Sequence, residues 1–202
     1  MRHLLQNSMA RPKTYNDDAV IDKALTVFWE KGFIGASSRD LIEATGISNG
    51  SLFNRFGDKK QLYLACLQKY ADVYITELER LLATDMPFKK KLRKVLENTM
   101  RKAPDSNAYE GCFFFNTSVD SGIDDKDILL VTAGIRKRIE QAFHAAIEQA
   151  KKIERLPIRI DSAEMAKYFS AINTGLRALA KNNTSAAEMT TIINTTLKLL
   201  PF

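Results

Sequence analysis

The sequence predicts an all-α protein, with a three-helix N-terminal unit followed by six further helices. Apolar residues recur at helical spacing along nearly the whole chain, and no apolar–polar alternation of period two persists over six residues. Helix-start and helix-stop residues separate these apolar runs. With 202 residues and 45% hydrophobic content, the chain is large enough for one substantial core or two small ones.

The first helix is expected over about residues 17–31. Acidic residues stand at its start, where carboxylates complement the helix dipole, and Gly32 is predicted to end it. Its apolar face is formed by Val20, Ile21, Ala24, Leu25 and Phe28.

Two short helices are predicted next, over Arg39–Thr45 and Asn49–Arg55. Ser37 stands three residues before Asp40, as an N-cap and its capping-box partner do. Gly46 follows the first helix where a left-handed C-terminal glycine belongs, and Ser48 supplies the next N-cap. The apolar residues that could lock the two helices together are Leu41, Ile42, Ile47, Leu52, Phe53 and Phe56.

The fourth helix is expected from Asp58 to about Ala83. At about 25 residues and 1.5 Å per residue it would span nearly 40 Å, enough to connect two domains. Pro87 is predicted at the first position of the fifth helix. The last five helices are expected over about residues 86–102, 112–119, 126–152, 162–181 and 185–200.

A helix, a tight turn with glycine and a second helix form the helix-turn-helix unit, whose second helix fits the DNA major groove. Three motifs here are Phe28-Trp29-Glu30-Lys31-Gly32-Phe33, Ala44-Thr45-Gly46-Ile47-Ser48-Asn49-Gly50-Ser51-Leu52-Phe53 and Phe56-Gly57-Asp58-Lys59. Through them the stretch from about Asp17 to Tyr70 resembles the DNA-binding domain of the TetR/AcrR family of bacterial repressors. The resemblance implies a DNA-binding domain over residues 14–60 and a TetR-type ligand-binding and dimerisation domain over residues 61–202.

The residues expected to contact DNA lie at the start of the second helix and on the third. Hydroxyls, free amides and a guanidinium at a helix start can bind phosphate, whereas Asn, Arg and aromatic side chains can read base edges. The predicted set is Ser37, Ser38, Arg39, Ser48, Asn49, Gly50, Ser51, Phe53, Asn54, Arg55 and Lys59. Phe53, Asn54 and Arg55 depart from the commoner family pattern, so the operator cannot be copied from a relative.

Several of these residues also have a purely structural interpretation. Ser37 and Ser48 could serve only as helix caps, Arg39 as a solvated residue and Phe53 as part of the core. Residues 1–13 are expected to form a flexible leader, in which Arg11-Pro12-Lys13 is either a minor-groove arm or a disordered tail. The basic run Lys89–Lys94 is interpreted as a solvated helix face. The net charge of +6 is not concentrated in the predicted reading domain, since residues 1–60 carry only +2 of it.

The resemblance also implies a homodimer that binds a palindromic operator and releases it when a small molecule binds. Small and apolar residues on the last two helices would form a four-helix interface or, alternatively, face their own core. The interface set is Ile172, Gly175, Leu176, Leu179, Met189, Ile192, Ile193 and Leu197. The effector, expected to be apolar or planar, would contact Tyr70, Tyr74, Cys112, Phe113, Phe114, Phe143 and Phe169 unless these residues are plain core.

Cys112 offers an alternative switch, because a thiol at a helix N-terminus forms thiolate more readily and could sense oxidants or electrophiles. A helical adaptor that does not bind DNA is a second alternative. An enzyme is not expected, since no phosphate-binding loop or nucleophile motif is present, and no cofactor or metal is predicted. Two cysteines, no export signal and no long apolar stretch predict a cytoplasmic protein without a membrane span.

Overall fold

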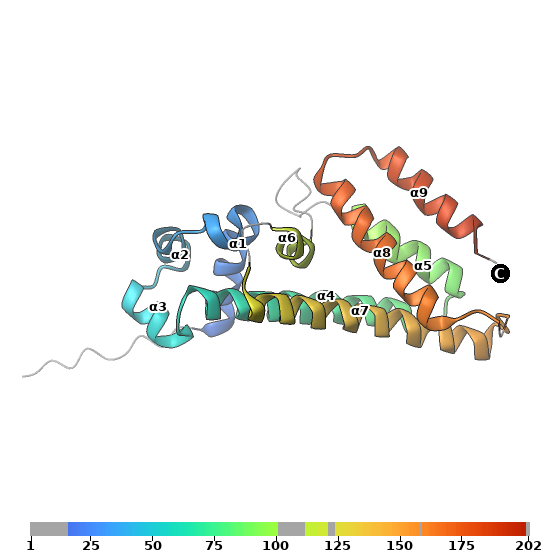
Figure 1. Ribbon diagram of the computed structural model, residues 1–202, viewed down its shortest axis with the longest axis horizontal. Coiled ribbons are helices and arrows are strands. Elements are labelled where there is room, and N and C mark those ends of the chain that lie inside the picture. The colour runs from blue at the N-terminus through green and yellow to red at the C-terminus, as the bar shows by residue number, and fades with distance from the viewer. Residues whose placement is uncertain (1–15, 101–111, 121–123, 158, 201–202) are drawn as a thin grey trace, which may run out of the picture.

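The computed structural model describes residues 16–100, 112–120, 124–157 and 159–200, and within these ranges the fold is all-α (Figure 1). The elements are α1 (Asp17–Gly35), α2 (Ser38–Thr45), α3 (Asn49–Phe56), α4 (Lys59–Leu82), α5 (Phe88–Glu97), the 3₁₀ turn η1 (Asn98–Met100), α6 (Phe113–Val119), α7 (Lys126–Ile153), α8 (Ser162–Lys181) and α9 (Ala186–Lys198). The predicted fold class and helix order are therefore confirmed.

Three of the expected helix boundaries were wrong. Gly32 interrupts α1 instead of ending it, and helical structure resumes as far as Gly35. Pro87 lies at the N-cap of α5 and not at its first helical position. This helix gives way at Asn98 to a 3₁₀ turn, the tighter winding that is common at helix ends, so it does not continue to the predicted end.

The helices are arranged around one long pair. Figure 1 shows α4 and α7 side by side along the molecule, with α1, α2 and α3 at one end and α5, α8 and α9 at the other. We call the first group with the adjoining part of α4 the head. Two buried apolar clusters match this division, one in the head and one among α4, α5, α7, α8 and α9.

The core of the head extends beyond residue 60. It includes Leu62, Tyr63 and Leu67 of α4, and it also takes Phe113 from α6 and Ile128 from α7. The two halves of the molecule therefore share helices instead of being joined by a linker.

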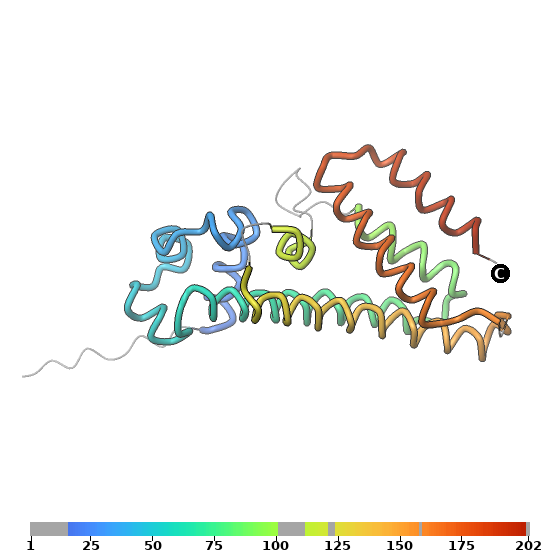
Figure 2. The backbone as a smooth tube through the Cα atoms, viewed as in Figure 1, coloured from blue at the N-terminus to red at the C-terminus, as the bar shows by residue number. Residues whose placement is uncertain are grey.

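The short helix α6 contacts elements of both halves, with α1 and α4 on one side and α7 and α8 on the other (Figure 2). The Phe113 ring lies 6.0 Å from Trp29 and 5.3 Å from Tyr63, measured between ring centroids. The Tyr63 and Thr117 hydroxyls share a hydrogen bond of 2.7 Å, and burial raises the pKa of Tyr63 to about 12, so this phenol stays neutral. A displacement of α6 would be transmitted directly to α1 and α4.

Gly32 is expected to be essential for the bend within α1. Its φ of 71° and ψ of 175° fall in a region that is essentially restricted to glycine, and an added Cβ would lie 3.3 Å from Oδ2 of Asp120. We expect Gly32→Ala to lower the free energy of unfolding by about 1–3 kcal/mol. Thermal denaturation would then show a melting temperature lower by roughly 3–10 °C. Gly35→Ala is the matched control, since it has no positive φ and its nearest contact is 3.7 Å away; equal losses in both variants would contradict the argument.

Three further expectations concern the N-terminal leader, a membrane span and the basic run. The predicted leader over residues 1–13, with Arg11-Pro12-Lys13, lies outside the described residues. No helix in the described ranges is long and apolar enough to cross a membrane. The basic run is solvated at Lys89 and Lys90, but the prediction was wrong for Lys91, which is 4% exposed because it shares the inward face of α5 with Leu92 and Val95.

Candidate nucleic-acid interface and regulatory site

The α2–turn–α3 unit forms as its sequence signals predict. The Ser37 hydroxyl accepts a hydrogen bond from the Asp40 backbone N–H, and the Asp40 carboxylate accepts one from the Ser37 N–H at 2.8 Å. Gly46 takes the left-handed conformation (φ 73°) that ends α2. Ser48 caps α3 by accepting from the Ser51 N–H at 3.3 Å. The caps fix the directions of both short helices.

A small apolar core holds the two helices against each other. Leu41 of α2, Ile47 of the turn and Leu52 of α3 are fully buried in the head cluster. Ile42, Phe53 and Phe56 are only partly buried. With one face of α3 anchored through Leu52, its opposite face is left pointing outward.

Most of the residues predicted to contact DNA are exposed at the start of α2 and on α3. Phe53 and Lys59 are partly buried. The exposed ones are Ser37, Ser38, Arg39, Ser48, Asn49, Gly50, Ser51, Asn54 and Arg55. Such a surface combines hydroxyls, amides and a guanidinium, the groups that phosphates and base edges require.

Two cations of this surface have intramolecular partners that the sequence did not reveal. Arg55 forms an ion pair through its Nε with the Asp17 carboxylate at the start of α1. Lys59 Nζ lies 4.9 Å from the centroid of the Phe33 ring, and burial lowers the pKa of this lysine. Both contacts orient a side chain that the sequence alone leaves free.

A third ion pair fixes α2 on α1. Lys31 Nζ lies 2.5 Å from Oδ1 of Asp40, and its hydrogen bond, together with those from Ser37, holds the pKa of that carboxyl well below its usual range. Asp40 therefore stays ionised at neutral pH, and its negative charge is directed at α1 and the cap instead of toward a DNA backbone.

The residues predicted to bind an effector do not form a single cluster. Tyr70, Tyr74 and Cys112 lie together, with the Tyr70 hydroxyl donating to Cys112 Sγ at 3.2 Å and the two tyrosine rings stacked at 6.0 Å. Phe143 and Phe169 instead pack on each other at 5.9 Å within the core. Phe113 joins the head cluster, and Phe114 lies in the core cluster of the other half.

Sequence reasoning missed two residues beside Tyr70, Tyr74 and Cys112. Asn173 of α8 donates through Nδ2 to the Tyr74 hydroxyl at 2.7 Å, and the Arg177 guanidinium lies 4.4 Å from the centroid of the Tyr74 ring. The available signal was a polar pair at i and i+4 within the apolar face of α8.

Cys112 is 1% exposed and its sulfur accepts the Tyr70 hydrogen bond. It occupies the N-cap of α6, with no side-chain cap bond. A reagent in solution has no direct path to this thiol, so the structure does not favour the alternative of a cysteine switch.

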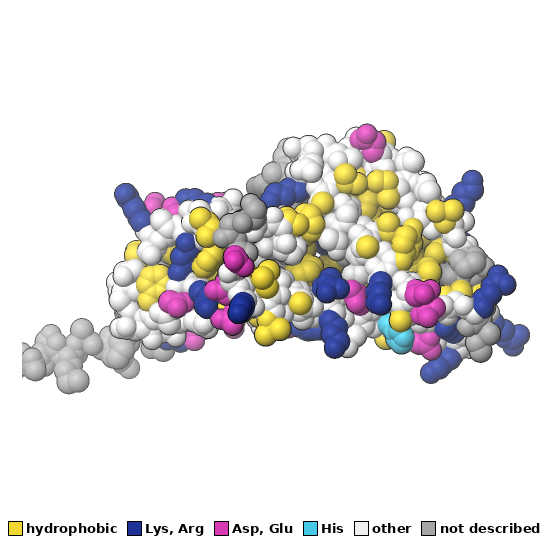
Figure 3. Space-filling view, viewed as in Figure 1, with side chains coloured by type: hydrophobic (Ala, Val, Ile, Leu, Met, Phe, Trp, Pro, Cys, Tyr) yellow, Lys and Arg dark blue, Asp and Glu magenta, His cyan; other side chains and the backbone are white. Residues whose placement is uncertain are grey.

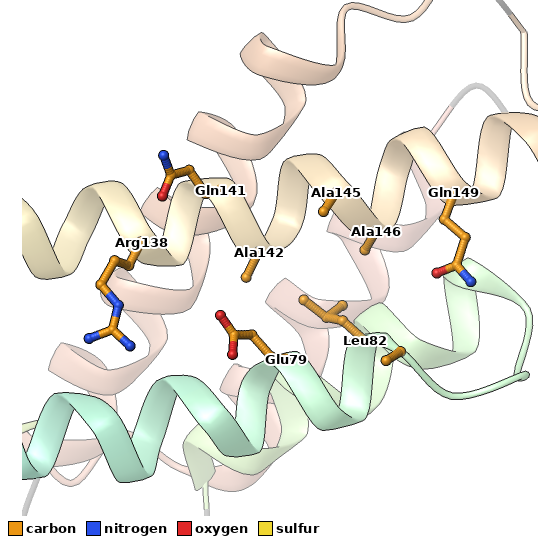
Figure 4. A pocket seen from close by; sticks show the side chains of 9 residues that line it. Glu79, Leu82, Arg138, Gln141, Ala142, Ala145, Ala146 and Gln149 are labelled. Carbon is orange, nitrogen blue, oxygen red and sulfur yellow. The ribbon is translucent and has the colours of Figure 1, made fainter.

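An open groove of about 410 Å³ lies elsewhere, between α4 and α7 (Figure 4). It is lined by small residues, including Ala142, Ala145 and Ala146, and by the charged residues Glu79 and Arg138. None of the residues predicted to bind an effector lines it.

The predicted interface residues divide equally between the surface and the interior. Ile172, Gly175, Leu179 and Ile192 retain exposed surface on α8 and α9. The other four, Leu176, Met189, Ile193 and Leu197, are buried in the chain's own core. The two outcomes arise because an amphipathic stripe has the same pattern whether it packs on its own chain or on a partner.

Two family models match the chain. Residues 20–66 match "Bacterial regulatory proteins, tetR family", and residues 89–196 match "Tetracyclin repressor-like, C-terminal domain". The second match alone covers more than half of the chain.

Individual relatives agree with these matches. The chain is 26% identical over 198 residues to the HTH-type transcriptional repressor ComR of Escherichia coli, covering 98% of this chain and 94% of that protein. It is 24% identical to the HTH-type transcriptional repressor BdcR of Escherichia coli over 89% of this chain and 86% of that protein.

Solved structures show the same fold. A cysteine mutant of the TetR family regulator CifR, complexed with 26-bp operator DNA, has a TM-score of 0.81 at 21% identity, covering 95% of this chain and 100% of that one. The reduced form of NemR from Escherichia coli has a TM-score of 0.80 at 16% identity, covering 90% and 94%. The family matches, together with the helix-turn-helix surface, show that the chain belongs to the TetR family of bacterial regulatory proteins and is a DNA-binding transcriptional regulator, not an enzyme.

Proposed function

We propose that this regulator is a homodimeric repressor that binds a palindromic operator and releases it when a small-molecule effector binds. The observation that carries the proposal is the outward face of α3. Leu52 anchors the helix, while Asn49, Gly50 and Asn54 stand exposed on it. A recognition helix presented in this way can enter the major groove.

Dimerisation is supported by the surface of α8 and α9. Figure 3 shows hydrophobic side chains gathered on the face over these helices. Gly175 is exposed on α8, and nothing lies within 4 Å of the position that its Cβ would occupy, so a second helix could approach closely. Two symmetric protomers would present two α3 helices to two half-sites, which explains the palindrome.

Repression and release are supported by the relatives and by the packing of α6. ComR and BdcR are both named as repressors. Within this chain, Phe113 of α6 contacts the head, and Cys112, which precedes it, lies in the core cluster of the other half of the molecule. A ligand beside Cys112 would therefore alter the position of the head. Release then follows from a change in the spacing of the two recognition helices.

Selection of duplexes from a random pool with purified protein tests the proposal. We expect a palindromic consensus that is bound at nanomolar affinity, with an affinity that falls steeply with salt because phosphate contacts release counterions. A single half-site should bind far more weakly. No enriched sequence, or an enriched sequence without symmetry, would contradict the proposal.

Gly50 offers a test that separates folding from DNA binding. Nothing lies within 4 Å of the position of its Cβ, and it sits inside α3, so Gly50→Ala should leave the free protein at least as stable as before and up to about 1 kcal/mol more stable. The added methyl would nevertheless stand between α3 and the base edges of the DNA major groove. We therefore expect operator affinity to fall about tenfold or more. Fluorescence anisotropy and thermal denaturation measure the two effects, and unchanged affinity would place Gly50 away from the DNA.

A further inference from the structure

The environment of Arg177 is unusual for a charged side chain. Its guanidinium packs against the Tyr74 ring at 4.4 Å, and its Nε is buried and makes no hydrogen bond. No carboxylate pairs with it among the described residues, whereas Arg93, Arg136 and Arg138 each pair with one. A buried guanidinium donor without an acceptor is energetically costly, and an arriving acceptor removes that cost.

Asn173 stands one turn before Arg177 on the same helix, and it too has a buried polar atom without a hydrogen-bond partner. The residue is 2% exposed, and its Nδ2 is used by the Tyr74 hydroxyl at 2.7 Å. Its Oδ1 is buried without a hydrogen-bond partner. The two side chains therefore present an unmatched donor and an unmatched acceptor, one helical turn apart.

The other side of this cluster is flat and uncharged. The Tyr70 and Tyr74 rings are nearly parallel, at 16°, with centroids 6.0 Å apart. Burial raises the pKa of Tyr70 well above its usual value near 10, so its hydroxyl stays protonated and donates to Cys112 Sγ. The Tyr70 phenol therefore brings no negative charge that would neutralise Arg177 at physiological pH.

We infer that the effector is a planar carboxylate, bound with its charged group on Arg177 and its ring against Tyr70 and Tyr74. A guanidinium matches a carboxylate with two parallel hydrogen bonds, and the single, partly buried cation of Arg177 balances a single negative charge. The free Oδ1 of Asn173 favours a hydroxyl or amine next to the carboxylate, as in a 2-hydroxybenzoate. This inference rests on the proposed function, because it names the chemical class of the effector.

The position of the cluster also explains how binding would be sensed. Cys112, which accepts the Tyr70 hydrogen bond, directly precedes Phe113, and the Phe113 ring lies 5.9 Å from Tyr70 and 6.0 Å from Trp29 of α1. A ligand that displaces the Tyr70 hydroxyl from Cys112 Sγ would therefore move α6 against the head.

Thermal denaturation of the full-length protein with a panel of acids tests the inference without DNA. The panel contains benzoate, 2-hydroxybenzoate, 1-naphthoate and indole-3-acetate, each beside its uncharged amide. At a hundredfold excess over Kd, a bound carboxylate should raise the melting temperature by roughly 5–10 °C, and its amide should not. Absence of a shift with every carboxylate, or equal shifts with the amides, would overturn the inference.

Three variants locate the site. Arg177→Met should weaken binding of the active carboxylate at least tenfold, while the ligand-free protein melts no lower than the parent because an unpaired buried donor has been removed. Arg177→Lys, which retains the charge, should bind with intermediate affinity and serves if the methionine variant does not fold. Arg138→Met, in the lining of the groove between α4 and α7, should bind normally. Loss of binding in Arg138→Met but not in Arg177→Met would overturn the assignment and place the acid in that groove.

The same variants distinguish this inference from the proposed function. The active carboxylate should lower operator affinity of the parent protein but not of Arg177→Met. If the protein selects a palindromic operator and no carboxylate releases it, the inference fails and the repressor proposal stands. Suppose instead that a carboxylate stabilises the parent but not Arg177→Met, and that the protein selects no operator. This result would support the carboxylate site and contradict the repressor proposal.

Discussion

Gly175→Glu is expected to convert the protein to monomers and to reduce operator affinity at least about 100-fold, because the second half-site is then bound independently. Gly175 lies exposed on α8, and nothing lies within 4 Å of its Cβ position, so the glutamate fits the folded protomer. Replacing a helical glycine even favours the helix by about 0.5–1 kcal/mol. At a dimer interface, the same carboxylate would be buried without a partner, at a cost of several kcal/mol.

Gly134→Glu is the matched control for this substitution. Gly134 is also an exposed helical glycine with open space at its Cβ position, but it lies on α7, away from the proposed interface. Sedimentation velocity at micromolar concentration should show dimers for the parent and the Gly134→Glu variant and monomers for Gly175→Glu. Dimers in all three proteins would show that α8 does not form the interface.

Arg55→Ala is expected to weaken operator binding by about 1–3 kcal/mol per half-site, which is the usual cost of losing a good base or phosphate contact. Its ion pair with Asp17 complicates the substitution, because the change removes that contact as well. Both partners are largely solvated, with side chains 40% and 48% exposed, so the ion pair itself is expected to contribute about 0–1 kcal/mol to stability.

Asp17→Asn separates the two roles of Arg55. It removes the ion pair but leaves the guanidinium, and it also removes a negative charge near the expected DNA surface. We therefore expect operator affinity equal to or higher than that of the parent, measured by anisotropy at several salt concentrations. If Arg55 contacts a phosphate, Arg55→Ala should also reduce the salt slope by about one unit per half-site. If Arg55→Ala and Asp17→Asn lost equal operator affinity, Arg55 would act through its ion pair and the structure of the head, and not through a DNA contact.

The order of the helices and the helix-turn-helix unit could be predicted from the sequence alone. Capping signals at Ser37 and Ser48 act within three or four residues, so they could be predicted from the sequence alone. The same is true of Gly46, whose left-handed conformation ends α2, and of Leu52, which anchors α3. Because most of the residues predicted to contact DNA are neighbours on α3 or at the start of α2, the composition of that surface followed directly from the sequence.

Contacts between residues far apart in the sequence could be identified only from the packing of the helices. Nothing local links Asp17 to Arg55, or Tyr74 to Asn173 and Arg177, since these contacts join helices that are far apart in the chain. Likewise, the pattern of α8 and α9 could not show that Leu176 and Met189 belong to the chain's own core while Gly175 stays exposed. Periodicity defines the apolar face of a helix, but the neighbour that covers this face is fixed only when the helices pack.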